Sequence, residues 1–300
     1  MNIFRASIVV MGFLSTSTSI AQDLEVTLLG TGTPRPSLDR LGPSTLVRRG
    51  NTVVLVDVGR GAFQRLSQLN VPYGDIDAIY LTHLHSDHVV GLPDLWLTGW
   101  LFSNRDSALT IYGPKGTADL VQNMRAAFAF DLHTRSTHES QALSGAELRV
   151  IEVEDGSAFN VEDFRVTAVE VDHHKVVPAF GYKIAFGNKT VAISGDTRYS
   201  ENFVKYAMNV DLLIHEVMAT SPHVPPAVQS VMEWHSSPSD VARIFSTTKP
   251  KLAVLSHLIL AGVSESQLFD EVKSEYTGRF VVGTDLMTFR IDNDISILQE

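Results

Sequence analysis

Short apolar runs, each ended by turn residues, recur along the chain from residue 24 onward. Residues 24–29 are an apolar-rich run that stops at a Gly-Thr-Gly-Thr-Pro segment, which predicts a strand and its end. Residues 44–48 and 52–58 flank a Gly-Asn pair, which is the pattern of a β-hairpin. Continuous β-branched residues and leucine at 53–56 favour a strand covered on both faces. The first part of the chain is therefore predicted to form a largely buried sheet.

Strand and helix patterns alternate through the rest of the chain. Further strands are predicted at residues 78–81, 109–112, 147–153, 164–171, 179–186, 190–194, 210–215 and 252–255, with two short strands closing the chain. Helices are predicted at residues 61–69, 92–102, 117–128, 200–208, 239–247 and 264–276, with Ser237 or Ser239 as the N-cap of the fifth. Each half is thus a run of strands followed by helix and strand units. This order predicts one α/β domain, residues 22–300, with two face-to-face sheets and helices outside.

Residues 1–21 have the layout of a secretory signal peptide. Arg5 supplies the positive charge, residues 6–14 are uncharged and mostly apolar, and Ser19 and Ala21 put small residues three and one before a cleavage point. An apolar stretch of this length is too short for a membrane-spanning helix, which needs about 20 residues. The alternative is a buried first strand or a short apolar helix. Cleavage after Ala21 predicts a periplasmic or secreted protein without a membrane anchor.

The composition excludes several classes of protein. With no cysteine among 300 residues, the chain has no disulfide scaffold, no thiolate zinc site and no cysteine nucleophile. Its formal net charge of −10 argues against broad nucleic-acid binding, which needs a basic surface. A small local basic patch remains open. We therefore expect a small-molecule substrate as the partner, and no nucleic acid.

Side chains of metal-ligand type gather where predicted strands end. Four of them lie within six residues after the strand at 78–81: His83, His85, Asp87 and His88. Imidazole and carboxylate suit zinc, and also iron or manganese. Three more follow later strands: His173, Asp196 and His257. A carboxylate such as Asp196 can bridge two ions held roughly 3.5–4 Å apart. This density favours a metal site over a polar turn.

The chain from residue 22 onward resembles the metallo-β-lactamase superfamily. The segment HLHSDH at residues 83–88 matches the superfamily signature. The resemblance is to the ribonuclease Z and arylsulfatase-like branch in particular, through LLGTGTPRPS, VDVGRGAFQRL, GLPDL, IYGPKG, PAFGYKI, SGDTR, HEV and LSH. It implies an αββα sandwich of two mixed sheets with outer helices. It also implies two Zn²⁺ ions per chain on the rim between the sheets, with Mn²⁺ or Fe²⁺ as alternatives.

The resemblance also implies a role for each candidate ligand. One ion would be held by His83, His85 and His173, and the other by Asp87, His88 and His257, with Asp196 bridging them. His173 is preferred to its neighbour His174 because four residues separate it from the PAFGY segment, although an exchange of the two stays open. Asp57, in the VDVG segment, would orient a ligand loop by accepting hydrogen bonds.

Three residues carry the expected chemistry beyond metal binding. By resemblance, His235 in the WHSS segment lies near the scissile group without binding metal, and Glu216 orients it. A histidine held by a carboxylate can donate a proton or stabilise negative charge. Asp87 would position the nucleophile. HEVMA and His-Ser-Ser depart from the family's usual segments, which leaves the substrate open, and an exposed loop position is the alternative for His235. His215 is expected to be a core histidine.

For most of the remaining aromatic and histidine residues we expect structural positions rather than a role in the chemistry. We expect Trp96, Trp100 and Phe102 to pack in the core. The alternative is that they line a pocket that accepts an aromatic group. Surface positions are expected for His133, His138 and His223, which lack ligand spacing. Trp234 and residues 222–226 are candidates for a lid.

The expected function is that of an exported hydrolase. Two zinc ions would share a hydroxide that attacks an aryl sulfate or a phosphodiester. A ribonuclease Z-type tRNA 3′ endonuclease is one alternative, and a lactonase or β-lactamase is another. Three features argue against a ribonuclease. Export would separate the protein from tRNA, and the negative net charge is unfavourable for binding a polyanion. The short segment at residues 185–194 leaves no room for a tRNA-clamping arm. A metal-binding protein without turnover is the non-enzyme alternative. Dimers are common in this branch, so a homodimer is an expectation.

Overall fold

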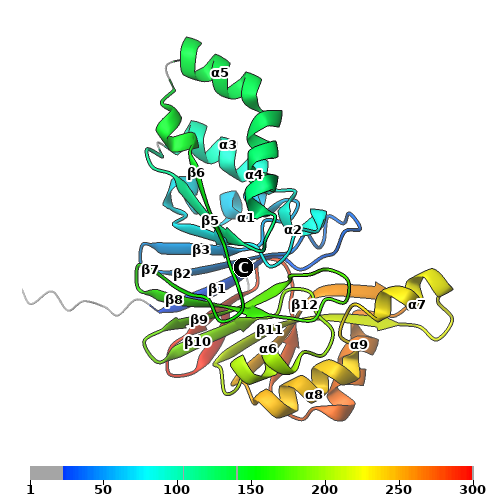
Figure 1. Cartoon of the computed structure of the whole chain (residues 1–300). Helices are drawn as coiled ribbons and strands as arrows, with labels where there is room; N and C mark the ends of the chain where they lie inside the picture. Colours follow the sequence, from blue (N-terminus) through cyan, green and yellow to red (C-terminus); the bar gives the residue numbers. More distant parts are fainter. Residues whose placement is uncertain (1–22, 104, 140, 299–300) are drawn as a thin grey trace, which may run out of the picture.

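The computed structural model describes residues 23–103, 105–139 and 141–298. The expected signal peptide, residues 1–21, lies outside these described residues. Two β-sheets pack face to face, and helices cover the outer face of each sheet (Figure 1). The four layers therefore follow the order helix, sheet, sheet, helix. The expectation of an αββα sandwich is confirmed.

The first sheet has eight strands within the described residues. Their spatial order is β15 (Ile295–Leu298), β14 (Thr288–Ile291), β1 (Leu24–Gly30), β2 (Ser44–Arg49), β3 (Thr52–Val56), β4 (Ala78–Tyr80), β5 (Leu109–Gly113) and β6 (Leu148–Glu152). Strands β1 to β3 form an antiparallel meander, whereas β3 to β6 run parallel. The final hairpin, β14 and β15, returns to pair with β1, so both ends of the described chain lie in this sheet.

The second sheet has seven strands in the same described ranges. Their order is β13 (Phe280–Val282), β12 (Leu252–Ala261), β11 (Leu212–Thr220), β10 (Lys189–Ile193), β9 (Phe180–Phe186), β8 (Phe164–Glu170) and β7 (Ala158–Val161). Strands β7 to β10 are antiparallel, and β10 to β13 are parallel. The sheet therefore repeats the mixed pattern of the first one.

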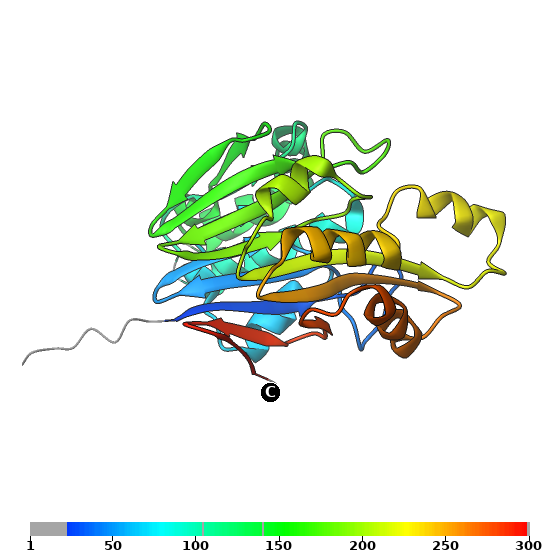
Figure 2. The same cartoon turned by 90° about the horizontal axis from the view of Figure 1, so that it is seen from below.

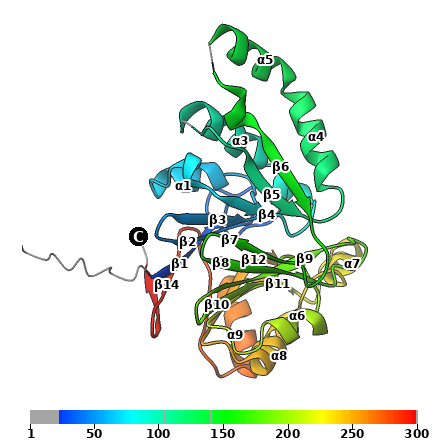
Figure 3. The ribbon, with the colours of Figure 1, turned by 60° about the vertical axis from the view of Figure 1, so that its left-hand side comes forward.

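The helices fall into two groups. On the side of the first sheet lie α1 (Ala62–Gln68), α2 (Ser86–Val89), α3 (Leu92–Phe102), α4 (Thr117–Ala127) and α5 (Ala129–His138), with short 3₁₀ turns η1 (Tyr73–Asp75) and η2 (Leu143–Ala146). On the other side lie α6 (Glu201–Tyr206), α8 (Pro238–Thr248) and α9 (Glu265–Glu275), as Figure 3 shows. The remaining helix, α7 (Pro226–Met232), projects from the end of β11 and β12 (Figure 2).

Apolar side chains fill the space between the sheets. Leu28, Val54, Tyr182, Ile214 and Phe289 lie in this layer and are completely or almost completely buried. Fully burying one such side chain contributes roughly 1.5–3 kcal/mol. Two outer clusters join the sheets to their helices. No helix among the described residues has the length and apolarity needed to cross a membrane.

The sequence-based elements differ from the structure mainly in length and in several omitted short elements. β11 continues to Thr220 and β12 to Ala261, beyond the predicted ends at 215 and 255, because polar His215 and Ser256 interrupt apolar runs without ending the strands. The omitted elements are β7, α2, α5, α7 and one of the three strands that close the chain, where two were predicted. No residue of β7 or α7 is fully buried, so their apolar patterns are weak. Of the two predicted N-caps, Ser237 caps α8.

Candidate metal centre

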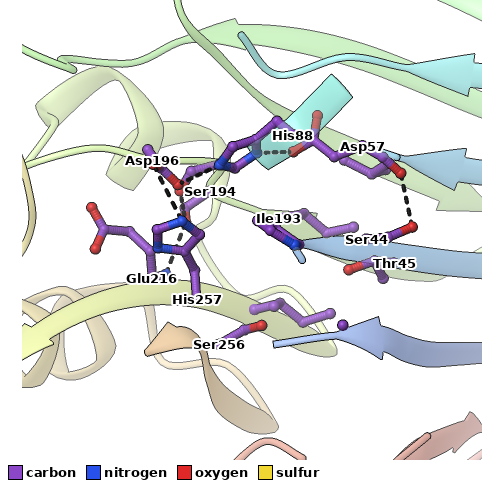
Figure 4. A pocket seen from close by; sticks show the side chains of 15 residues that line it. Ser44, Thr45, Asp57, His88, Ile193, Ser194, Asp196, Glu216, Ser256 and His257 are labelled. Carbon is purple, nitrogen blue, oxygen red and sulfur yellow. Dashed lines mark hydrogen bonds and ion pairs between the residues drawn. The ribbon is translucent and has the colours of Figure 1, made fainter. Parts of the chain in front are cut away.

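All seven expected metal ligands lie at one rim of the sandwich. The loop after β4 supplies His83, and α2 and its N-cap supply three more. The other ligands come from the second sheet: His173 follows β8, Asp196 follows β10, and His257 lies within β12. The ends of strands from the two facing sheets thus meet at this edge, where loops can offer polar side chains. Figure 4 shows Asp196, which follows β10, and His257 of β12 facing His88 of α2.

Backbone irregularities turn two of the polar side chains. Glu216 of β11 pairs with Ser256, and Val217 pairs with Leu258, so His257 is the extra residue of a bulge. Its φ is 45°, and that of Asp57 is 61°, both in the left-handed region. Bulges and left-handed residues re-aim side chains and occur often next to active sites.

The ligand atoms form two main groups, each with its atoms within 4.8 Å of one another. The first contains His83, His85, His173 and Asp196, and the second contains Asp87, His88 and His257. These are the groups that the resemblance implies. His174 belongs to neither group, and its backbone is in a left-handed conformation with a φ of 52°.

Asp196 connects the two groups. Its Oδ2 atom lies 3.8 Å from His83 Nε2 and 3.9 Å from His173 Nε2. The same atom is 3.5 Å from His257 Nε2, and Oδ1 is 3.3 Å from His88 Nε2. The carboxylate therefore faces ligands of both groups, which suits a bridging ligand.

The buried polar atoms of the rim fit divalent metal ions. His83 Nε2, His88 Nε2 and Asp196 Oδ1 are buried, and none has a partner of hydrogen-bond geometry within the described chain. Unpaired buried polar atoms cost roughly 1–3 kcal/mol each. Nitrogen and carboxylate oxygen atoms that converge in this way are the donor set of zinc, manganese or iron sites. Two metal ions, one in each ligand group, would satisfy all three atoms.

Most of the ligand histidines are oriented through their second ring nitrogen. His88 Nδ1 lies 2.7 Å from Asp57 Oδ2, and His83 Nδ1 lies 3.0 Å from Thr82 Oγ1. Asp57 also accepts hydrogen bonds from the backbone and hydroxyl of Thr82, each at 2.8 Å. His173 Nδ1 lies 3.0 Å from the Trp234 carbonyl oxygen. Such partners fix which nitrogen faces the metal. The sequence analysis predicted the role of Asp57. It missed the Thr82 hydroxyl and the Trp234 carbonyl, since neither group leaves a distinctive motif in the sequence.

The electrostatics of the rim favour neutral histidines in one group. Burial, reinforced by the neighbouring His88, lowers the pKa of His83 well below its ordinary value. Burial also lowers the pKa of His173 to about 4. His88 behaves differently: burial lowers its pKa, but the carboxylates of Asp196 and Asp57 outweigh that effect and raise it well above the ordinary value. The carboxylates therefore favour a cation at this point, which a proton or a metal ion can supply.

His235 and Glu216 form a buried pair beside the ligands. His235 Nδ1 lies 2.9 Å from Glu216 Oε1, which also accepts a hydrogen bond from the backbone of Thr197 at 2.9 Å. Burial opposes the protonated form of His235, but the Glu216 carboxylate raises the pKa of the histidine to about 9. Burial in turn raises the pKa of Glu216. The pair therefore keeps a proton that it can offer to an oxygen atom at the rim.

The alternative position expected for His235, an exposed loop, is not what the structure has, since the side chain is buried. The ring of His235 stacks on that of ligand His257, with centroids 5.9 Å apart. His235 also forms a third group of ligand type with Asp196 and His257. His235 is therefore placed where it can either bind a metal ion or donate a proton.

The other expected residues occupy plainer positions. Trp96 and Trp100 are buried, and their ring N–H groups donate to the carbonyls of Ala146 and Ala142, so they pack in the core and line no aryl pocket. Phe102 is 77% exposed, so the expectation of core packing is wrong for this residue, because α3 ends there at the surface. His215 is fully buried in the core. His133, His138 and His223 are exposed.

A small cavity of about 40 Å³ lies between the sheets behind the centre (Figure 4). Asp57, His88, Asp196, Glu216 and His257 line one side of it, and small polar residues such as Ser44 line the other. The cavity has room for a water molecule but not for a substrate. A substrate must therefore reach the ligands from the rim.

Comparisons with known proteins agree with this geometry. A family model described as Anti-Pycsar protein Apyc1 matches residues 24–239. Ribonuclease Z of Mycobacterium bovis (strain BCG / Pasteur 1173P2) is 34% identical over 270 residues, which cover 88% of this chain and 96% of that protein. The chain belongs to the metallo-β-lactamase fold family related to ribonuclease Z. Ribonuclease Z of Mycolicibacterium gilvum (strain PYR-GCK) is 36% identical over 241 residues, covering 79% of this chain and 84% of the relative.

Solved structures support the same assignment. Human tRNase Z, short form, has 26% sequence identity and a TM-score of 0.65, covering 88% of this chain and 98% of that one. The metallo-beta-lactamase fold protein YhfI from Bacillus subtilis has a TM-score of 0.73 at 20% identity, covering 90% of this chain and 100% of that one, and bears on the fold alone. This member of the family is a metal-dependent hydrolase. Its relatives favour the ribonuclease Z alternative of the sequence analysis over the aryl sulfate reading.

Proposed function

We propose that this protein is a phosphodiesterase that works with two divalent metal ions, zinc in the first place and manganese or iron as alternatives. One observation carries the proposal. Two ligand groups share the Asp196 carboxylate, and a buried histidine–carboxylate pair stands beside them. Two-ion sites of this kind suit the in-line displacement of phosphate esters. The ribonuclease Z relatives act on RNA by their name, which supports a phosphodiester rather than a sulfate ester.

Each residue of the site has a separate role in the proposed reaction. Bound ions would supply a water nucleophile at neutral pH and polarise the phosphoryl oxygen. Asp87, which is 3.4 Å from His257 Nε2, orients the nucleophile from the second ligand group. His235 offers its proton to the departing oxygen. Glu216 acts as a positioning residue, because its carboxylate holds the His235 ring at 2.9 Å.

A small phosphodiester is the substrate that the surface favours. The net charge of −10 repels a polyanion. β9 and β10 are joined by a tight turn at Gly187 and Asn188, so the chain has no extended arm at this point. Export through the signal peptide at residues 1–21 would place the enzyme in the periplasm or outside the cell, away from tRNA precursors. Recovery of periplasmic protein that begins at Gln22 would support export, and recovery of full-length protein from the cytoplasm would contradict it.

The first experiment compares activated esters. Zinc-loaded protein should hydrolyse bis-p-nitrophenyl phosphate faster than p-nitrophenyl sulfate and faster than a penicillin. Faster sulfate or penicillin turnover would overturn the proposal. Metal analysis by mass spectrometry should find two ions per chain, and the ion bound in protein from the native host decides among zinc, manganese and iron.

Ribonuclease activity is the second candidate, and a separate observation favours it. Arg60, Lys115 and Lys175 are exposed near the ligand loops, and within the described residues none of them lies within ion-pair distance of a carboxylate. Cations of this kind can contact phosphates of a nucleic acid. A tRNA precursor with a 3′ trailer is the test substrate. Cleavage after the acceptor stem at a kcat/KM above that for small diesters would make RNA the substrate.

The role of His235 has its own test. If His235 donates a proton to the departing oxygen, His235→Ala should slow hydrolysis of an unactivated dialkyl phosphate by about 10²-fold or more. The p-nitrophenyl diester should lose much less, because its leaving group needs no proton. Two ions should remain bound. Loss of one ion from the His235→Ala protein would instead make this histidine a metal ligand.

A further inference from the structure

The second ring nitrogen of His257 has no partner of the kind that orients most of the other ligand histidines. His257 Nε2 faces the metal centre, since it lies 3.5 Å from Asp196 Oδ2. Its Nδ1 atom is buried and has no hydrogen-bond partner within the described chain. A histidine that binds a metal ion through Nε2 carries a proton on Nδ1, and this N–H group almost always donates to a carboxylate, a carbonyl or a water molecule. His257 therefore needs an acceptor for this proton.

Glu216 has the opposite shortage, an acceptor without a donor. Its Oε1 atom accepts a hydrogen bond from the Thr197 backbone and lies near His235 Nδ1, each at 2.9 Å. Its Oε2 atom is buried and, among the described residues, has no partner. An unpaired buried oxygen is costly, and the cost is larger for a charged group than for a neutral one. The two unpaired atoms, Glu216 Oε2 and His257 Nδ1, are therefore complementary.

Both residues line the small cavity between the sheets. They come from neighbouring strands, because Glu216 of β11 pairs with Ser256 of β12, the residue before His257. Ser194 and Ser256 add hydroxyl-bearing side chains to the lining, as Figure 4 shows. A cavity holds a water molecule when it has roughly 10–15 Å³ of space and about two to four polar groups to bond it. With a volume of about 40 Å³, this cavity meets both conditions.

We propose that a water molecule in this cavity bridges His257 Nδ1 to Glu216 Oε2, so that one carboxylate positions a metal ligand and the proton donor His235 together. The inference rests on the proposed function, because it requires a metal ion at His257. Each hydrogen bond has a donor and an acceptor: Nδ1–H donates to the water oxygen, and the water donates to Oε2. The second hydrogen of the water can bond to the Ser256 hydroxyl. Glu216 is thus a positioning residue for two histidines.

The backbone at His257 gives the bridge a purpose. His257 is the extra residue of the bulge between β11 and β12, so strand pairing does not by itself fix the direction of its side chain. A hydrogen bond to Nδ1 would hold the ring in one orientation toward the metal ion. The ring lies nearly parallel to that of His235, with 17° between the planes and 5.9 Å between the centroids. This stacking suits two rings that are held by the two oxygens of one carboxylate.

The zinc affinity of the second ligand group tests the role of Glu216. In Glu216→Gln, the Thr197 N–H keeps the side-chain carbonyl at the Oε1 position, and the amide group at the Oε2 position cannot accept from the water. We expect this ion to bind about tenfold more weakly in competition with a chromophoric chelator, as when the partner of a ligand histidine is lost. Asp211→Asn is the matched control, because Asp211 is buried before the other end of β11 and accepts from the Thr190 backbone at 2.7 Å. This control and His235→Ala should keep both wild-type affinities, since the bridge passes through neither side chain.

A pair of variants at Ser256 tests the water molecule itself. Ser256→Val replaces the hydroxyl with two methyl groups that fill the cavity and displace the water, whereas Ser256→Ala leaves room for it. We expect the valine variant to weaken the same ion about as much as Glu216→Gln does, and the alanine variant to keep the wild-type affinity. Wild-type affinity in Ser256→Val would overturn the bridge. This pair decides the matter even where Glu216→Gln does not fold.

A crystal structure of the zinc-loaded protein gives a direct readout. It should show a water molecule within hydrogen-bond distance of both His257 Nδ1 and Glu216 Oε2. A cavity without water, or a direct contact between the two side chains, would overturn the inference.

None of these measurements needs turnover, so they separate the bridge from the proposed function. A protein that binds two ions and cleaves no phosphodiester would refute the function and leave the bridge to the affinity test. A protein that cleaves phosphodiesters and keeps both wild-type affinities in Glu216→Gln would refute the bridge alone. If the wild-type protein binds no ion at His257, the bridge and the two-ion function both fail, and the metal analysis shows this before any variant is made.

Discussion

The Asp57 carboxylate should control the affinity of one metal ion without touching it. In Asp57→Asn, the side-chain carbonyl can still accept from the Thr82 backbone, but the amide group faces His88 Nδ1, which lies 2.7 Å from Asp57 Oδ2 in the wild type. Asparagine also tolerates the left-handed backbone at this position, where φ is 61°. The substitution therefore removes the oxygen that faces both His88 and the Thr82 hydroxyl, and it leaves the local backbone in place.

The expected loss of metal affinity follows from the contact between Asp57 and His88. A hydrogen bond to a charged group contributes about 1.5–3 kcal/mol, and losing the partner of a ligand histidine typically weakens metal binding by about 10–100-fold. We expect this loss for the ion held by Asp87, His88 and His257, and a smaller change for the other ion. Competition with a chromophoric chelator measures both affinities.

Asp77→Asn is the matched control for Asp57→Asn. The Asp77 carboxylate accepts from the Val53 backbone at 2.8 Å and lies at the start of β4, away from the rim. Its substitution should change stability slightly and leave both zinc affinities unchanged. If the Asp57→Asn protein bound both zinc ions with the same affinities as the wild type, the reasoning would be refuted.

Three further predictions concern the centre and its support. Asp196→Ala should lose both metal binding and turnover, because this carboxylate faces both ligand groups; full activity with two bound zinc ions would contradict a bridging role. Gly195→Ala should lower the free energy of unfolding in urea by more than about 1 kcal/mol, since φ is 61° and a Cβ would lie 2.7 Å from the Phe180 carbonyl. Removal of the ions by a chelator should lower the melting temperature, because each site occupied at 100 times its Kd stabilises the fold by about 2.7 kcal/mol.

The ligand residues could be predicted from the sequence because their chemistry is local. His83, His85, Asp87 and His88 lie so close in the chain that the end of one strand presents them together. His173, Asp196 and His257 are separated in sequence, yet each belongs to a strand or strand end of the second sheet, and the sandwich brings those to the same rim. The predicted strand ends and the family motifs together were therefore enough to predict the ligand residues.

The orienting contacts and helix α7 could not be predicted in the same way. The Trp234 carbonyl that orients His173 is a backbone atom, so no residue type at that position signals it. The bulge at His257 appears only when β12 is paired with β11, because it is a difference in register between two strands. Helix α7 buries no residue, so no strong apolar pattern in the sequence indicates it.

The metal ligands and helix α7 occupy different parts of the fold. The ligands lie at strand ends, on α2 and, for His257, within β12, so a change in one of them acts directly on the metal centre. α7 lies between β11 and α8 and takes no part in either sheet. Substitutions in α7 can therefore be made without moving Asp196 or His257. We accordingly expect substitutions at the rim to change the rate for every substrate.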